Sequence, residues 1–232
     1  MDRPMTTLFM LMSADGKIST GSTDELDFDR DLPQLPGVRE GLHQYYELEQ
    51  DSELWSLNTG RVMEKIGVNQ LSDPSKLPVS FAIVDRRHLS AAGVAYLCAK
   101  LRKLVVITSN PAHPALAMHE DNLSVIYQEQ PSLEQALYRL KYSHGCERLT
   151  VQSGGTLNSA LLRAGLIDKI DVVVAPVIVG GKDTPTLVDG PSFTMTAELA
   201  GLRALELESC EALEDSYVRL RYKVRGPRDA RS

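Results

Sequence analysis

The segment from Val151 to Leu162 constrains this chain more than any other feature of the sequence. Val151 ends an apolar run typical of a strand, Gly154 and Gly155 follow, and apolar residues then recur at helical spacing. A strand that turns through two glycines into a helix directs unpaired backbone N–H groups, and the positive end of the helix dipole, into the turn. Because glycine has no Cβ, a phosphate or a ring can approach the main chain there. On the glycine pair alone, a tight turn without a ligand is the simpler interpretation.

The sequence on both sides of this turn decides between the two interpretations. After the helix come Gly165-Leu166-Ile167-Asp168, an apolar strand ending in Ala175-Pro176, and Gly180-Gly181. Near the N-terminus, an apolar strand over residues 8–12 leads into Ser13-Ala14-Asp15-Gly16-Lys17. These two segments resemble the reductase domain of riboflavin biosynthesis, a family with the dihydrofolate-reductase-like fold. With weaker agreement between them, the resemblance covers most of the chain.

Composition excludes several other classes of protein. The 232 residues are 43% apolar, which suits a compact α/β domain and is too high for disorder. The net charge of −6 argues against nucleic acid or an anionic membrane as the main partner, although the field inside a pocket is local. No apolar run is long enough to span a membrane, and no signal peptide precedes the first strand, so we expect a cytoplasmic protein. Cys98, Cys146 and Cys210 lack the spacing of a metal site and are expected to be reduced thiols.

Alternating strand and helix patterns predict an α/β fold with a mainly parallel central sheet flanked by helices and a C-terminal antiparallel hairpin. We expect one domain over residues 1–224 and a disordered tail over 225–232. The acidic stretch over 20–36 is either a loop beside the active site or a solvated surface loop, and the solvated loop is the simpler interpretation. The predicted strands are 6–12, 53–58, 79–84, 104–108, 123–127, 148–152, 170–178, 202–210 and 215–224. The predicted helices are 37–50, 60–66, 92–101, 112–119, 132–143 and 156–164.

The glycine turn is the first candidate for binding a dinucleotide, through Ser153, Gly154, Gly155, Thr156 and Leu157. No Gly-x-Gly-x-x-Gly motif lies near it, so the classical doubly wound dinucleotide fold is disfavoured. The Thr156 hydroxyl can contact a phosphate or cap the helix, and the sequence does not choose between these roles.

Two further strand ends are candidates for phosphate contacts. Gly60-Arg61 resembles the Gly-Arg-x-Thr turn of dihydrofolate-reductase-like enzymes, in which the arginine approaches the phosphates of the cofactor; Met63 replaces the threonine. Thr108 and Ser109 end a buried strand, and the resemblance places that turn at the adenosine 2′-phosphate. Arg86-Arg87 is another possible contact of this kind. Taken alone, Gly60-Arg61 is a weak signal for which a solvated surface arginine is the default interpretation. An ordinary turn or solvated arginines explain the other two signals equally well.

Ser13, Asp15 and Ser153 are the candidate residues for substrate binding, and Asp15 is also the candidate catalytic residue. A carboxylate at the end of the first strand can accept hydrogen bonds from ribose hydroxyls or a pyrimidine N–H, although Asp-Gly is also a common turn. No metal site is expected. Because no His/Cys cluster has zinc-ligand spacing, the deaminase often fused to this reductase is not expected either.

The resemblance implies an NADPH-dependent oxidoreductase like the 5-amino-6-(5-phosphoribosylamino)uracil reductase, which transfers a hydride to the ribose C1′ of a ribosylamino-pyrimidine phosphate. It also implies a homodimer. Two departures fall near the substrate: Ser153 stands where family members have an acidic residue, and Phe9 stands where they often have lysine. Two alternatives therefore stay open. One is an NADPH-dependent reductase of this fold for a pterin or folate-like heterocycle, and the other is a non-catalytic nucleotide-binding homologue.

Overall fold

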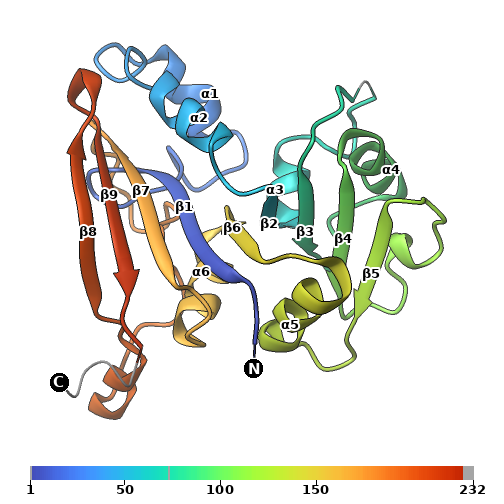
Figure 1. The fold of residues 1–232 in the computed structure, drawn as a ribbon. Coiled ribbons are helices and arrows are strands. Elements are labelled where there is room, and N and C mark those ends of the chain that lie inside the picture. The colour runs from blue at the N-terminus through green and yellow to red at the C-terminus, as the bar shows by residue number, and fades with distance from the viewer. Residues whose placement is uncertain (1, 73, 227–232) are drawn as a thin grey trace. The chain divides into compact units, whose positions relative to one another are not determined.

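The computed structural model describes residues 2–72 and 74–226, and its backbone divides into two compact units (Figure 1). One unit comprises residues 1–5 and 53–153 and is called the five-strand unit here. The other comprises residues 6–52 and 154–232 and is called the four-strand unit. The prediction of one domain over residues 1–224 stays a prediction.

The five-strand unit contains a parallel sheet in the strand order β5-β4-β3-β2-β6. Its strands are β2 (Trp55–Thr59), β3 (Ser80–Val84), β4 (Lys103–Thr108), β5 (Leu123–Tyr127) and β6 (Arg148–Val151). Its helices are α3 (Gly60–Lys65), α4 (Ala91–Lys100) and α5 (Leu133–His144), with a 3-10 turn η2 at Pro114–Leu116.

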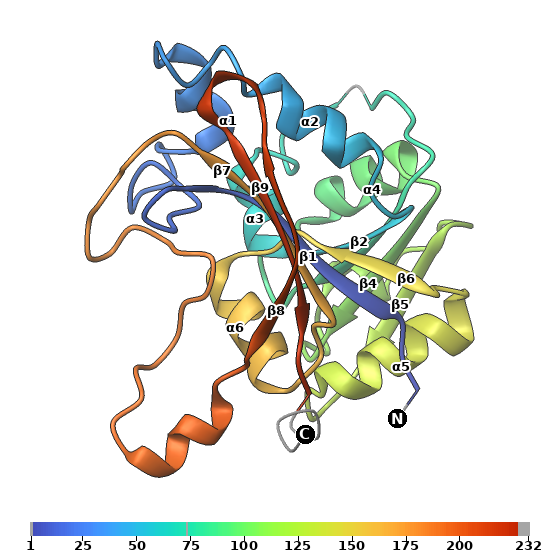
Figure 2. The same ribbon diagram turned by 60° about the vertical axis from the view of Figure 1, so that its left-hand side comes forward.

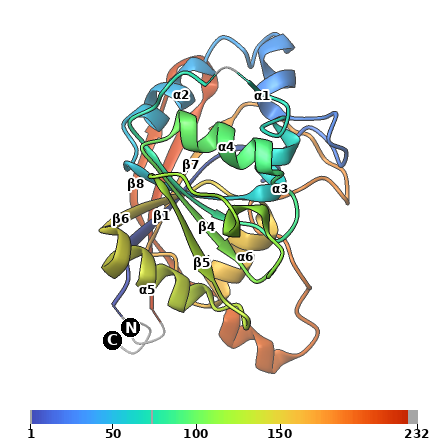
Figure 3. The same cartoon turned by 90° about the vertical axis from the view of Figure 1, so that its right-hand side faces the viewer.

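The chain direction explains how helices cover both faces of this sheet (Figure 3). Strand connections between parallel strands are right-handed, so the step from β3 to β4 and the return from β5 to β6 put α4 and α5 on opposite faces. Leu104, Val105 and Val106 are therefore fully buried, which is why β4 reads as a continuous apolar run. The α4 face contains one core cluster, which includes Ile83, Val94 and Leu97.

The four-strand unit has the strand order β1-β7-β9-β8. β1 (Met5–Ser13) and β7 (Lys169–Ala175) are parallel, whereas β8 (Leu205–Ala212) and β9 (Val218–Val224) are antiparallel to their neighbours. The helices are α1 (Phe28–Asp31), α2 (His43–Gln50) and α6 (Gly155–Arg163), with 3-10 turns η1 (Leu32–Gln34), η3 (Thr196–Gly201) and η4 (Glu214–Ser216). Figure 2 shows the long orange segment that leaves β7 and reaches η3 before β8 begins.

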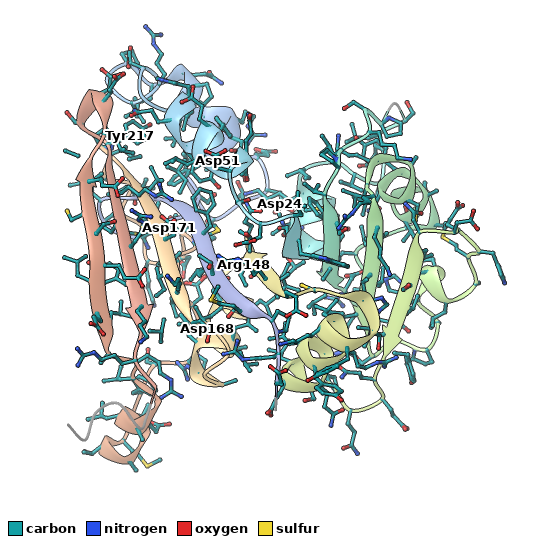
Figure 4. The ribbon with its side chains drawn as sticks, in the orientation of Figure 1. Asp24, Asp51, Arg148, Asp168, Asp171 and Tyr217 are labelled. Atoms are coloured by element: carbon teal, nitrogen blue, oxygen red, sulfur yellow. The ribbon has the colours of Figure 1, made fainter. Side chains whose placement is uncertain are left out.

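Two aspartates tie the strands of this unit together (Figure 4). Asp171 on β7 accepts two hydrogen bonds from the Arg219 guanidinium on β9, at 2.9 and 2.7 Å. Asp168, just before β7, accepts from the backbone N–H of Thr6 on β1 at 2.8 Å. The bidentate Asp171–Arg219 pair fixes the register of β7 and β9 as well as adding stability.

The structure confirms the predicted fold class: the strands are mainly parallel, and the last two form the antiparallel pair. All nine predicted strands exist among the described residues, with bounds shifted by a few positions. The predicted helix over 112–119 is wrong, because only the η2 turn forms there, and the predicted helix over 37–50 begins only at His43.

The prediction of a solvated loop over residues 20–36 is also wrong in part. Within that stretch, α1 and η1 place Phe28 and Leu32 in the core of the four-strand unit. The predicted tail over 225–232 lies outside the described residues from residue 227 onward. In the described ranges, no helix combines the length and apolar composition needed to cross a membrane.

Candidate functional site

The turn after β1 holds the first candidate residues of the four-strand unit. The buried Ser13 hydroxyl donates to Asp15 Oδ1 at 2.6 Å. Asp15 also accepts from the backbone N–H groups of Val179 and Gly180, at 3.1 and 2.7 Å. These hydrogen bonds, that of Ser13 first, lower the pKa of the Asp15 carboxyl to about 2. Asp15 is therefore an anion near neutral pH, suited to accepting hydrogen bonds and not to donating a proton.

Lys17 organises the same turn from its buried side. Its ammonium donates to the carbonyl oxygens of Gly181 and Thr184, at 2.7 and 3.0 Å. Its backbone N–H donates to the Ser13 hydroxyl oxygen at 2.9 Å. Sequence reasoning assigned no role to Lys17, although its place in the Ser-x-Asp-Gly-Lys motif was the available signal. The motif thus fixes the loop that follows β7.

The glycine turn begins α6, and its two glycines have different surroundings. Gly154 is the helix N-cap with φ −68°, and a Cβ built on it meets no atom within 4 Å. A Cβ on Gly155 would lie 2.3 Å from the carbonyl oxygen of Thr186 and 2.4 Å from Asp189 Oδ2. Open space for a ligand therefore lies beside Gly154, whereas Gly155 is required for close packing against the chain itself.

Two details of the turn differ from expectation. Neither glycine has a positive φ, so backbone strain does not explain the pair. Thr156 is exposed at the second helical position and does not cap α6, because Gly154 occupies the N-cap without a side-chain hydrogen bond. The Thr156 hydroxyl thus has no capping role to fulfil. Leu157, the next residue of the predicted set, is half-buried in the first turn.

Residues 186–189 join the glycine turn to the turn after β1. The backbone N–H of Asp189 donates to the Gly155 carbonyl at 3.0 Å, and that of Leu187 donates to the Gly16 carbonyl at 3.0 Å. The Asn158 amide, on the first turns of α6, donates to the Leu187 carbonyl at 2.9 Å. Both motifs noticed in the sequence and the loop after β7 therefore meet in one unit.

The two departures from the family pattern occupy different environments. Phe9 is 3% exposed and stacks on Tyr45 with ring centroids 5.2 Å apart, inside the core cluster of the four-strand unit. Phe9 is therefore a core residue of the four-strand unit. Ser153, the last residue of the five-strand unit, is also buried and precedes Gly154 directly.

The remaining candidates lie at strand ends of the five-strand unit. Its register aligns Thr59, Val84 and Ile107, so the carboxyl ends of β2, β3 and β4 share one edge. Thr59 caps α3 by accepting from Val62 N at 3.2 Å, and Gly60 opens that helix. Ligands of open α/β sheets gather at such an edge.

Arg61 is exposed on the first turn of α3 and pairs with Glu64 at 3.3 Å. Thr108 is buried, and its hydroxyl oxygen accepts from the Asn110 backbone N–H at 3.1 Å. Ser109 is half-buried beside it. The structure therefore brings Gly60, Arg61, Thr108 and Ser109 to one edge of the five-strand unit.

Arg86 and Arg87 follow β3 at the same edge and are exposed. In the part of the chain that the structure describes, neither guanidinium has a hydrogen bond or an ion pair. Two unpaired guanidinium groups, in a chain with a net charge of −6, favour an anionic ligand at this edge. Within the described ranges, no group of His, Cys, Asp and Glu side chains is arranged to hold a metal ion.

Comparison with known proteins gives the family. The family model described as the RibD C-terminal domain matches residues 4–218. The chain belongs to this family. The 2,5-diamino-6-ribosylamino-4(3H)-pyrimidinone 5′-phosphate reductase of Methanothermobacter thermautotrophicus is 28% identical over 229 residues, which cover 97% of this chain and 100% of the relative. The family predicted from the sequence is thereby confirmed.

A second relative and a solved structure agree with this assignment. The reductase of the same name from Archaeoglobus fulgidus is 32% identical over 96 residues, covering 41% of this chain and 40% of the relative. RibD of Acinetobacter baumannii has a TM-score of 0.67 at 20% identity, covering 97% of this chain and 59% of that chain. The structural likeness confirms the fold, and the relatives are named as reductases, as the resemblance implied.

Proposed function

We propose that this protein is an NADPH-dependent reductase of riboflavin biosynthesis that acts on a ribosylamino-pyrimidine 5′-phosphate. The names of its relatives specify the 2,5-diamino-pyrimidinone form of this substrate. The cofactor, when bound, supplies a hydride that forms a C–H bond at the ribose C1′. The bond between C1′ and the ring oxygen breaks, that oxygen takes up one proton, and the product carries a ribityl chain while NADPH becomes NADP⁺.

The observation that carries this proposal is the meeting of the Ser13–Lys17 turn, the loop after β7 and the glycine turn in the four-strand unit. Their contacts use backbone groups and hydrogen bonds, and they leave the space beside Gly154 open. Hydride transfer between two bound ligands needs positioning more than a strong acid or base. The arrangement supplies that kind of positioning.

The residues of the chain fit a phosphorylated nucleotide. At the start of α6 the first backbone N–H groups have no partner within the helix, and Gly154 lets an anion approach them. We assign the pyrophosphate or nicotinamide end of NADPH to this turn, with Ser153, Gly155, Thr156 and Leu157 around it. The unpaired guanidinium groups after β3 favour NADPH over NADH, because only NADPH carries a 2′-phosphate.

Asp15 and Ser13 are the proposed substrate contacts at the end of β1, and Ser153 is the third. We propose that Asp15, as an anion, orients a ribose hydroxyl or a pyrimidine N–H during the reaction. The turnover experiment below separates this substrate from the pterin or folate-like alternative.

We also propose a homodimer that covers the β8 edge. Leu205 and Leu207 on this edge strand are 43% and 55% exposed, and an edge strand with exposed leucines invites pairing unless it is covered. Leu207→Arg should convert a dimer to a monomer in sedimentation analysis. If the wild-type chain is itself a monomer at micromolar concentration, the proposal is wrong.

The three unpaired cysteines support a cytoplasmic location.

The decisive experiment is turnover of two candidate substrates. The purified chain should oxidise NADPH in the presence of the 2,5-diamino-6-ribosylamino-pyrimidinone 5′-phosphate and release the ribitylamino product, identified by mass spectrometry. Dihydrofolate should give no turnover. Tight NADPH binding with no turnover of the pyrimidine would leave a reductase for another substrate, and absence of NADPH binding would refute the whole proposal.

A further inference from the structure

A buried carboxylate that the proposed reaction does not use lies at the end of β3. Asp85 is 2% exposed and accepts hydrogen bonds from five groups. The backbone N–H groups of Arg87, His88 and Leu89 donate to it at 3.2, 3.0 and 3.0 Å, and the His88 ring donates through Nδ1 at 2.9 Å. The fifth donor is Nε2 of His113, at 2.9 Å. Asp85 thereby fixes the backbone of the turn from Arg86 to Leu89.

His113 comes from a different turn and is itself buried. Its Nδ1 accepts from the backbone N–H of Ala115 at 3.2 Å, so the proton of the neutral ring lies on Nε2, which donates to Asp85. Burial raises the pKa of the Asp85 carboxyl, but the hydrogen bonds of His113, Leu89 and His88 outweigh it and hold that pKa well below its usual range. The pair is therefore a neutral imidazole donating to an anion.

Asp85 connects three turns at the ligand-binding edge of the five-strand unit. Its backbone N–H donates to the Ile107 carbonyl at 2.9 Å, which joins the end of β3 to that of β4. A Cβ on Gly60 would lie 2.2 Å from Asp85 Cγ, so the start of α3 packs directly on this carboxylate. Asn110, after β4, donates its side-chain amide to the Arg86 carbonyl at 2.7 Å.

These contacts hold the backbone of Arg86 and Arg87 while leaving both guanidinium groups exposed and, among the described residues, unpaired. A flexible surface pair would lose conformational entropy on meeting a phosphate, and a fixed backbone reduces that loss. We propose that Asp85 and His113 form a positioning pair that holds the Arg86-Arg87 turn for recognition of the nucleotide 2′-phosphate. This inference rests on the proposed use of NADPH.

The test compares two substitutions of His113 in the full chain. His113→Phe removes the Nε2 donor, whereas His113→Gln retains an N–H donor at a similar reach. We expect His113→Phe to reduce the preference for NADPH over NADH, measured as the ratio of dissociation constants by calorimetry, by about tenfold. The same loss should appear in the ratio for adenosine 2′,5′-bisphosphate over 5′-AMP. His113→Gln should keep most of the preference, and affinity for NADH should stay constant in both variants.

A double-mutant cycle separates positioning from general loss of structure. In the Arg86→Ala/Arg87→Ala background, the preference for the 2′-phosphate is already reduced, and His113→Phe should reduce it no further. Asn110→Ala, at a partly exposed position, loosens the same turn without leaving a buried charge unpaired. A thermal melt shows whether His113→Phe folds. If it does not fold, the nucleotide preference of Asn110→Ala tests the positioning role instead.

The outcomes distinguish this inference from the proposed function. An unchanged NADPH preference in folded His113→Phe, or in Asn110→Ala if His113→Phe does not fold, overturns the positioning role. So does an equal loss with and without the two arginines. A wild-type chain that binds neither nucleotide overturns the use of NADPH and this inference together.

Discussion

The paired glycines at the start of α6 give the sharpest prediction, because one side chain added at each should have opposite consequences. Gly155→Ala places a Cβ 2.3 Å from the Thr186 carbonyl oxygen and 2.4 Å from Asp189 Oδ2, so the loop over 186–189 must move. Overpacking of this kind costs about 1–3 kcal/mol. For a chain of this size each kcal/mol lowers the melting temperature by about 2–4 °C, so we expect a drop of about 2–12 °C.

Gly154→Ala is the matched control for stability. Its φ of −68° suits any residue, and no atom lies within 4 Å of the added Cβ. Reduced freedom of the unfolded chain adds about 0.4–1 kcal/mol, and a poorer N-cap removes a similar amount. The melting temperature should therefore change by about 1 °C or less, which differential scanning calorimetry resolves.

Ligand binding should show the reverse order of effects. Gly154→Val fills the open space beside the α6 N-terminus and should weaken NADPH by at least about tenfold in calorimetric titration, while the protein stays folded. Wild-type NADPH affinity in Gly154→Val would refute the assignment of this turn to the nucleotide. A wild-type melting temperature in Gly155→Ala would refute the packing argument.

Three further predictions concern single side chains. Arg61→Ala should weaken NADPH by about tenfold and leave NADH nearly unchanged; equal loss for both nucleotides removes Arg61 from the 2′-phosphate. The folded-state pKa of Asp15, about 2, lies below its usual 3.8, so the stability that this carboxylate contributes is present above about pH 4 and is lost as the pH falls toward 2. Asp15→Asn should therefore flatten the dependence of the free energy of unfolding on pH between about 4 and 2. An unchanged dependence in this variant contradicts the hydrogen bonds described. Phe9→Lys, which restores the family residue, should cost at least about 3 kcal/mol in urea unfolding by burying a charge against Tyr45, and a wild-type midpoint would show that position 9 is not core.

The positions of the sheet strands could be predicted from the sequence because buried parallel strands consist of short runs of apolar residues. β3, β4 and β5 were found within one residue of their bounds for this reason. The false helix over 112–119 ignored Pro114, whose fixed φ and missing N–H suit the first residue of a short turn. A proline also restricts the residue before it, so His113 is extended and accepts from Ala115 as a cap.

α1 was missed because aspartates dominate its surroundings. Phe28 and Leu32 are four residues apart and both enter the core, which is the spacing of one helical face. Asp27 caps the helix by accepting from Asp29 N at 3.1 Å, so an acidic residue there starts a helix instead of marking a solvated loop.

The candidate site was predictable in its motifs but not in its contacts. The sequence marked Gly155 as special, yet the atoms that require a glycine there belong to Thr186 and Asp189, which only tertiary structure brings near. Asp85 and His113 are likewise 28 positions apart, and nothing in the local sequence of either residue indicates the other. Periodicity and turn chemistry are local signals, so they locate turns but not the partners of those turns.

The tertiary contacts of each residue also explain which residues of the family motifs this chain retains. Asp15, Lys17 and Gly155 hold the main chain of the loop over 177–189, so each is required by the scaffold whatever the ligand. The side chain at position 9 does not hold this loop, because the Phe9 ring stacks on Tyr45 in the core. A lysine at that position is therefore not needed for folding. The retained motif residues thus support the proposed geometry of the reaction, whereas the identity of the substrate depends on the kinetic experiment.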